Sequence, residues 1–180
     1  MTDAELVARA QAGDRDAFGE LVLRYGPTVR RLTRAVLRHP DDADDAAQDA
    51  FLSAWRRLGR FDPGRPLGPW LVRIAVNAAR DLGRRQRLRS AEPLPEGQPA
   101  PAPAPDQAAD RALLRERLAA ALAKLPERQR LVVLLFDGEG YSHAEIAELV
   151  GAPPGTVRSD LFHARRALRD ALGSVLEREE

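Results

Sequence analysis

The densest candidate chemistry in this chain is a cluster of arginines between residues 56 and 90. Ten arginines there are opposed only by Asp62 and Asp81, so the segment has a net charge of +8 in a chain whose formal total is +1. Guanidinium groups donate paired hydrogen bonds to phosphates, and a basic cluster on one face is typical of polyanion-binding proteins. A general preference for arginine, shown by the single lysine at Lys124, explains the residue type but not the clustering.

Part of this cluster recurs at helical spacing. The positions i, i+4, i+7 and i+11 are taken by Arg73, Asn77, Arg80 and Arg84. The apolar stripe on the other side is formed by Leu71, Ile74, Ala78 and Leu82. This pattern predicts an amphipathic helix from Trp70 onward with a basic outer face. The preceding segment FDPGRPLGP, from Phe61, is expected to be a loop, with Pro69 suited to the helix start.

A second set of candidate contacts lies in YSHAEIAELVGAPPGTVRSDLFHARRAL, from Tyr141. Ser142 and Glu145 predict a capping box, and Gly151 can adopt the left-handed conformation that ends a helix. Pro153 and Pro154 can then begin the next helix without amide donors. A turn of this length fits a helix-turn-helix, although an ordinary helical hairpin is the alternative.

The second helix of this unit is expected to pack through Val157, Leu161, Ala164 and Leu168. That stripe leaves outward Arg158, Ser159, Phe162, His163 and Arg166. In a helix-turn-helix these side chains would enter the major groove of DNA. Arginine can donate two hydrogen bonds to guanine, serine is an adaptable polar contact, and phenylalanine can touch a thymine methyl group.

An acidic face is expected on a helix from Asp41 to Leu58. Its buried stripe is predicted to contain Ala47, Phe51, Ala54 and Leu58, and another face to carry Asp45, Gln48, Asp49 and Arg56. Aspartates in a first helical turn stabilise the helix dipole, which accounts for Asp41 and Asp42. The dipole explains less at Asp49, two turns into the helix.

Helical periodicity dominates the whole chain, which predicts an all-α fold. Thr2 and Glu5 suggest a capping box, and Asp14 can cap a second helix. Gly26-Pro27 is expected to bend or restart that helix, and His39-Pro40 to end the segment that follows.

The segment from Ala91 to Ala109 contains six prolines and few residues that could enter a core. It predicts an extended, flexible linker between a first domain at residues 1–90 and a second at 110–180. A proline-rich ligand motif is disfavoured because basic flanks are absent. The second domain should begin with a helix whose buried face is formed by Leu114, Leu118, Ala121, Leu122 and Leu125. A further helix should contain residues 131–136 and end in a turn at 137–140.

Several functional classes are disfavoured by composition. The chain has no cysteine, and its three histidines are widely separated, so no disulfide, metal site or cofactor is expected. A nuclease or another helical enzyme is suggested only by scattered carboxylates that do not converge with a histidine, so no catalytic residue is assigned. No apolar run approaches a membrane span and the start lacks a signal-peptide pattern, which predicts a cytoplasmic protein without membrane insertion.

Four segments together resemble the conserved regions of extracytoplasmic-function (ECF) sigma factors of the bacterial sigma-70 family. They are DADDAAQDAFLSAWRRL from Asp42, WLVRIAVNAARD from Trp70, LAKLPERQR from Leu122, and the helix-turn-helix segment from Tyr141. They occur in the family's order and at its spacing, and they cover nearly the whole chain except the linker.

The resemblance implies an alternative sigma factor that binds core RNA polymerase and directs initiation at promoters with particular minus-10 and minus-35 elements. It implies that residues 1–90 are sigma region 2 and residues 110–180 sigma region 4. Region 2 would dock on the clamp helices of the largest polymerase subunit through Asp45, Gln48 and Asp49. The flap of the polymerase is a further expected contact, and an anti-sigma factor an expected partner.

For the minus-10 element, the resemblance implies capture of the non-template strand by the loop from Phe61 and the helix after it. Asn77 and Asp81 fall at base-reading positions, and the expected phosphate contacts are Arg73, Arg80, Arg84 and Arg85. Binding the separated strand would offset the free energy of opening the duplex. The helix-turn-helix would read the minus-35 element, and no nucleotide hydrolysis is required.

Two positions depart from the pattern of many relatives, which have arginine where this chain has Asp160 and His163. Both changes are expected to lower the positive charge next to DNA, and Asp160 could accept a hydrogen bond from cytosine or repel a phosphate. His163 would make binding pH-dependent if it contacts phosphate. The alternative function is a stand-alone helix-turn-helix regulator that binds duplex DNA without polymerase, which the basic helix and the acidic face disfavour.

Overall fold

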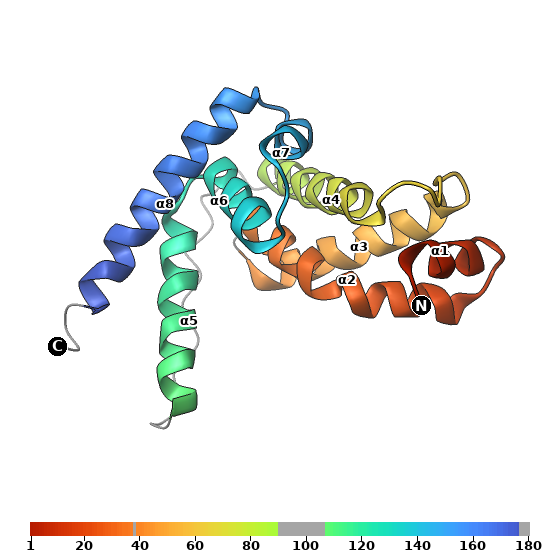
Figure 1. Cartoon of the computed structure of the whole chain (residues 1–180), viewed down its shortest axis with the longest axis horizontal. Helices are drawn as coiled ribbons and strands as arrows, with labels where there is room; N and C mark the ends of the chain where they lie inside the picture. The colour runs from red at the N-terminus through yellow and green to blue at the C-terminus, as the bar shows by residue number, and fades with distance from the viewer. Residues whose placement is uncertain (38, 90–106, 177–180) are drawn as a thin grey trace. The chain divides into compact units, whose positions relative to one another are not determined.

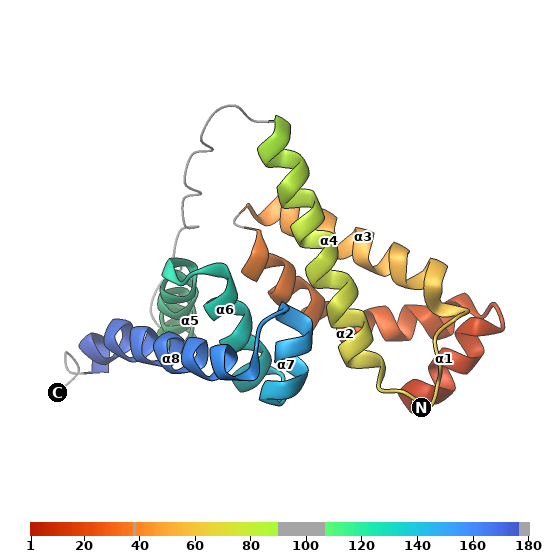
Figure 2. The ribbon, with the colours of Figure 1, turned by 90° about the horizontal axis from the view of Figure 1, so that it is seen from above.

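The computed structural model describes residues 1–37, 39–89 and 107–176 (Figures 1 and 2). Within these ranges the regular structure is helical and contains no strand, which confirms the predicted all-α class. The chain divides into two compact units, Met1–Leu94 and Pro95–Glu180. Most of the expected linker lies outside the described residues, and residues 107–109, which were assigned to it, are the first residues of a helix.

The first unit contains α1 (Asp3–Gln11), α2 (Arg15–Val36), α3 (Pro40–Leu58) and α4 (Leu67–Arg89). Helices α2, α3 and α4 pack against one another, and α1 lies mainly on α2 (Figure 1). Local sequence rules explain the starts, because Thr2 and Glu5 form the capping box of α1 and the Asp14 carboxylate accepts from two amides of α2.

Helix α2 runs through Gly26-Pro27 without ending, so of the two predicted alternatives, a bend or a restart, the restart is wrong. Pro27 has no amide hydrogen for the carbonyl of Leu23, one turn earlier. Both residues are exposed, so water can reach that carbonyl. On the opposite side Leu21, Val29 and Leu32 are buried, and this packing holds the helix continuous.

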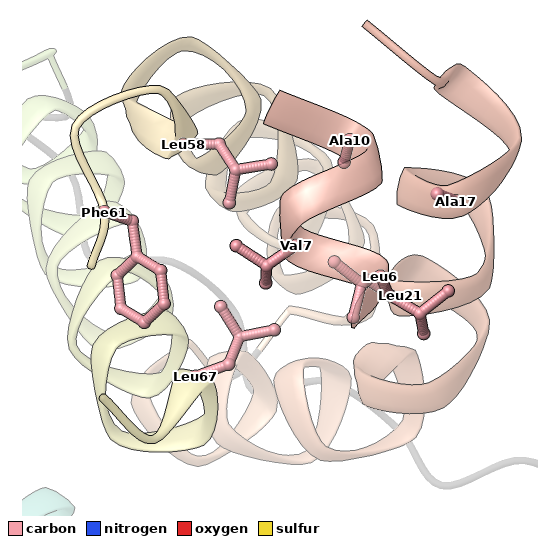
Figure 3. Close-up of a cluster of buried hydrophobic side chains, with 8 residues drawn as sticks. All are labelled: Leu6, Val7, Ala10, Ala17, Leu21, Leu58, Phe61 and Leu67. Atoms are coloured by element: carbon pink, nitrogen blue, oxygen red, sulfur yellow. The ribbon is translucent and has the colours of Figure 1, made fainter. Parts of the chain in front are cut away.

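One core cluster joins the N-terminus of the unit to the loop before α4 (Figure 3). In this close-up the side chains of α1 and α2 point toward Leu58 at the end of α3, Phe61 in the loop and Leu67 at the start of α4. The Phe61 ring lies against Trp70, with ring centroids 4.7 Å apart. Both ends of the loop are thus fixed by buried side chains, while residues 62–66 between them are exposed.

Small side chains determine how α3 meets its neighbours. Its buried positions are largely alanines, namely Ala43, Ala46, Ala47, Ala50 and Ala54. Helix α4 contributes Ala75 and Ala79 to the buried surface. It begins at Leu67, earlier than predicted, with Pro69 in its first turn, where no intrahelical amide bond is needed.

The second unit contains α5 (Gln107–Lys124), α6 (Glu127–Val133), the π-helical turn η1 (Leu134–Gly138), α7 (His143–Val150) and α8 (Pro154–Leu176). Helix α8 packs against α5, α6 and α7. Fully buried side chains include Leu131, Leu135, Ile146 and Val157. The buried Arg130 donates to the carbonyl oxygens of Leu122 and Ala123 and so caps the end of α5.

Two predictions for this unit are corrected. Leu114 and Leu118 are 52% and 38% exposed, whereas Ala121 and Leu125 are buried as expected. Figure 1 shows the N-terminal part of α5 projecting away from the other helices of this unit, so its leucines share a stripe that no described neighbour covers. The helix after Pro126 also continues as η1 through Asp137 and Gly138, which were expected to form a turn.

Candidate nucleic-acid and polymerase interfaces

The basic residues of α4 lie opposite its buried side. Arg73, Asn77, Arg84 and Arg85 are exposed, while Arg80 and Asp81 are half-buried. Residues of the opposite side, such as Leu71, Val72, Ala75 and Ala79, are buried. Asp81 accepts a hydrogen bond from Arg84 one turn later, so this carboxylate is already held by a cation. The structure thus brings the six predicted minus-10 residues to the accessible part of one helix.

The loop before α4 is preorganised at its tip. The Asp62 carboxylate accepts a hydrogen bond from the Gly64 amide at 2.9 Å, which closes a tight turn. Arg65 lies near the same carboxylate, with its Nε 3.9 Å from Oδ2. This exposed, turned segment lies directly before the basic helix.

The acidic face of α3 is exposed at Asp45, Gln48 and Asp49, as predicted. Leu52, one turn beyond, is 53% exposed and continues the same face at the i+7 position from Asp45. Leu52 was not among the contacts predicted from the sequence, although its helical spacing from Asp45 indicated this face. The face therefore combines negative charge with one large apolar side chain.

The predicted outward residues of α8 are all exposed, including Phe162 at 64%. The buried residues beneath them are Val157, Leu161 and Ala164, while Leu168 is half-buried. The Phe162 and His163 rings meet edge to face, with centroids 5.6 Å apart. A groove of about 510 Å³ beside α8 is lined by Arg158, Phe162 and Arg166, and also by Arg165 and Arg169, which were not among the predicted contacts.

The start of α7 has the predicted capping geometry. The Ser142 hydroxyl and amide donate to Glu145 at 2.7 and 2.8 Å, and the Glu145 amide donates back at 3.3 Å. Gly151 ends the helix with φ of 71°, the left-handed conformation expected from the sequence. Burial, together with the charges of Glu139 and Glu145, raises the pKa of Tyr141 to about 12, so this phenol stays neutral at physiological pH.

A cluster of side chains fixes α8 against the elements before it. Arg165 donates to the Asp137 carboxylate, and its guanidinium carbon lies 5.2 Å from the centroid of the Phe136 ring. Phe136 in turn lies against His143, with ring centroids 4.6 Å apart. These contacts join η1, α7 and α8 and so fix the orientation of α8.

The Asp160 side chain is turned inward and not onto the outer face of α8, which corrects the expectation that its carboxylate contacts a base or a phosphate directly. The residue is 6% exposed, and its carboxylate accepts hydrogen bonds from Arg128 in α6. Helical periodicity places Asp160 between the outward Ser159 and the inward Leu161. The direction of its side chain is decided by the position of α6, which periodicity does not give. The exposed part of α8 from Arg158 to Arg166 therefore has no carboxylate.

Within the described ranges, no group of three or more His, Cys, Asp or Glu side chains is arranged to hold a metal ion. Among the same residues, no helix is long and apolar enough to cross a membrane.

Comparison with known proteins identifies both units. Residues 21–89 match Sigma-70 region 2, and residues 115–168 match Sigma-70, region 4. The ECF RNA polymerase sigma factor SigM of Mycobacterium tuberculosis is 41% identical over 175 residues, which are 96% of this chain and 85% of SigM. The ECF RNA polymerase sigma-E factor of Escherichia coli K12 is 32% identical over 194 aligned residues, covering 99% of this chain and 98% of sigma-E.

Solved structures give the same result. CnrH of Cupriavidus metallidurans, in complex with the cytosolic domain of CnrY, aligns with a TM-score of 0.67 and 33% identity over 96% of this chain and 97% of CnrH. RpoE of Bartonella quintana, in complex with the anti-sigma factor NepR, aligns with a TM-score of 0.69 and 26% identity over 87% and 96% of the two chains.

The helical fold and the two matched regions are those of sigma-70-type initiation factors. Within that class, the chain belongs to the ECF sigma factors. It is therefore an alternative sigma factor, which binds core RNA polymerase and directs initiation at selected promoters. The comparisons confirm the resemblance inferred from the four sequence segments.

Proposed function

We propose that this sigma factor divides promoter recognition between α4 and α8. Helix α4, with the exposed loop at residues 62–66, would hold the separated non-template strand of the minus-10 element, and α8 would read the minus-35 duplex. The observation that carries this proposal is the basic face of α4, where Arg73, Arg84 and Arg85 are exposed above a buried apolar side.

On α4, the exposed Asn77 amide can both donate to and accept from a base edge, and Asp81 can accept from an amino group. The Asp81–Arg84 pair places a cation beside this carboxylate, which favours approach of a phosphate. Arg73, Arg80, Arg84 and Arg85 would hold the backbone of the opened strand. Their contacts would offset the free energy of unpairing and unstacking.

On α8, the proposed minus-35 contacts are Arg158, Ser159, Phe162, His163 and Arg166. With Asp160 turned toward α6, this face presents arginine, serine, histidine and an exposed aromatic ring. Such a set suits guanine edges, thymine methyl groups and phosphates. Asp160 is therefore no longer expected to read cytosine.

For core RNA polymerase, Asp45, Gln48 and Asp49 would meet a basic surface on the clamp helices of the largest subunit, with Leu52 as an apolar contact. The exposed leucines of α5 offer an apolar surface for the expected flap contact. Because one structural relative is bound to an anti-sigma factor, we propose that such a partner also covers these faces here. The protein would act in the cytoplasm, without a cofactor or a catalytic step of its own.

Reconstitution with bacterial core polymerase on a library of random promoter sequences tests this function. The expected result is initiation from defined start sites on templates enriched in a minus-10 and a minus-35 element. Specific binding to duplex DNA by the free protein, with no directed initiation, would instead support the stand-alone regulator. Matched templates with only one element scrambled would separate the contributions of the two regions.

A further inference from the structure

An ion pair joins the first turn of α6 to the recognition helix. Arg128 Nε lies 2.5 Å from Oδ2 of Asp160, and Nη2 lies 3.4 Å from Oδ1. The guanidinium thus meets the carboxylate along one edge, with two parallel contacts that fix its plane. The hydrogen bond and charge of Asp160 raise the pKa of Arg128.

The two partners differ sharply in exposure. The Asp160 side chain is 9% exposed, whereas that of Arg128 is 51% exposed. The contacts with Asp160 use Nε and Nη2 of Arg128. The two N–H groups of Nη1 are not used in this ion pair. A buried carboxylate therefore holds a half-exposed guanidinium in one orientation.

The pair lies at the border of the recognition face. Asp160 follows the exposed Ser159 in sequence, and His163, one turn later, shares its side of α8. When a recognition helix occupies the major groove, the sugar-phosphate backbones run along the borders of its face. A fixed cation at this border has the position and donors of a phosphate contact.

We propose that Arg128 binds a backbone phosphate of the minus-35 element and that Asp160 is its positioning residue. This inference rests on the proposed reading of minus-35 by α8. It adds a contact from α6, outside the helix-turn-helix itself. It also gives Asp160 a function at DNA that acts through Arg128 and not through a base.

Stability alone does not require this arrangement. A well-packed apolar pair often stabilises a fold as much as a buried ion pair does, because desolvation offsets the attraction between the charges. An apolar pair would leave no hydrogen-bond donor at the border of α8. The half-exposed guanidinium supplies those donors, and its charge releases counterions when it meets DNA.

The test uses the full chain assembled with core polymerase and a promoter fragment that this wild-type holoenzyme selects. Closed-complex affinity is measured over a series of KCl concentrations for Arg128→Ala, with Arg115→Ala as the control for removing an exposed arginine from the same unit. Arg128→Ala should weaken binding about tenfold and lower the slope of log affinity against log salt by about 0.9, the contribution of one phosphate. Arg115→Ala should change neither quantity.

A charge swap separates positioning from a purely structural role. In the R128D/D160R double variant the ion pair is restored but the arginine is displaced from α6, so melting should recover toward wild type while the salt slope stays reduced. Arg128→Lys, which keeps the charge but loses the two-point contact, should keep the slope and bind more weakly. If the double variant does not fold, the salt slope of Arg128→Lys distinguishes a phosphate contact from a purely structural role.

The outcomes are distinguishable. A wild-type slope for Arg128→Ala in a holoenzyme that still selects minus-35 would overturn this inference alone. A double variant that regains both the slope and the affinity would also overturn it, because the pair would then be structural. A wild-type holoenzyme with no minus-35 preference would overturn the proposed function and the inference together.

Discussion

Gln11 and Leu58, which lie 47 positions apart, are joined by a hydrogen bond of 2.8 Å from the Gln11 side-chain amide to the Leu58 carbonyl oxygen. The same amide nitrogen donates to the Phe61 carbonyl at 2.7 Å. One side chain of α1 thus satisfies the end of α3 and the start of the loop that precedes α4. The N-terminal helix thereby supports the candidate minus-10 site without belonging to it.

Replacing Gln11 tests this support. Gln11→Ala should lower the free energy of unfolding by about 1–2 kcal/mol, because the Phe61 carbonyl loses this donor and the Leu58 carbonyl keeps only the Phe61 amide. Urea denaturation measures the change, and Gln129→Ala, at a half-exposed glutamine in the other unit, provides the control. Opening of promoter DNA should weaken more than closed binding, because the loop loses an anchor. Equal stability of Gln11→Ala and wild type would contradict this assignment.

The turn between α7 and α8 depends on Gly151, whose φ of 71° disfavours any side chain. Gly151→Ala should destabilise the protein by about 1–2 kcal/mol, because a Cβ atom is strained in this conformation. Gly155→Ala is the matched control, since Gly155 lies in the first turn of α8 and an added Cβ would meet nothing within 4 Å. This control should raise stability by about 0.5–1 kcal/mol. Thermal unfolding of both variants measures the contrast.

Local rules were sufficient to predict the capping boxes at Thr2 and Ser142, the cap at Asp14 and the left-handed Gly151. Each of these features depends on a few neighbouring residues, so the sequence contains the whole determinant. Helical periodicity likewise placed the exposed residues of α3, α4 and α8 on the correct faces. These successes explain why the fold and most of the candidate site could be predicted.

The errors concern partners distant in sequence. Helix α2 continues through the exposed Pro27 because its opposite side is packed against neighbouring helices. Leu114 is exposed because α5 projects beyond its neighbours. Asp160 occupies a border position, and its direction depends on Arg128, 32 residues earlier. Periodicity identifies a stripe on a helix but does not tell which element covers it.

Acid should weaken the start of α7 through Glu145. Hydrogen bonds from the Ser142 hydroxyl, and then from its amide, hold the pKa of Glu145 below its ordinary value of 4.5. A carboxyl group whose pKa is lower in the folded state stabilises that state above its unfolded pKa, and this contribution fades as pH falls through the folded pKa. Glu145→Gln should therefore be less stable than wild type at pH 7, and the difference should shrink below about pH 4.

Melting temperatures of both proteins between pH 7 and pH 3 measure this effect, provided that unfolding is reversible. Glu148→Gln, on the same short helix but outside the capping box, controls for a general loss of charge. A stability difference between Glu145→Gln and wild type that stays constant down to pH 3 would show that the carboxylate charge is not responsible.

The division of promoter recognition predicts different kinetic defects in the two units. Asn77→Ala should slow or weaken open-complex formation with little change in closed binding, because its proposed contact exists only after the strands separate. Arg158→Ala should weaken closed binding by about 1–3 kcal/mol and relax the base preference at one minus-35 position, because an arginine that contacts a guanine edge acts on intact duplex.

Two assays separate these steps. Permanganate reactivity of unpaired thymines measures strand opening, and gel retardation of the holoenzyme–promoter complex without heparin measures closed binding. A scrambled minus-35 element should abolish the effect of Arg158→Ala but leave that of Asn77→Ala. If both substitutions impaired the same step on the same templates, α4 and α8 would not have separate functions.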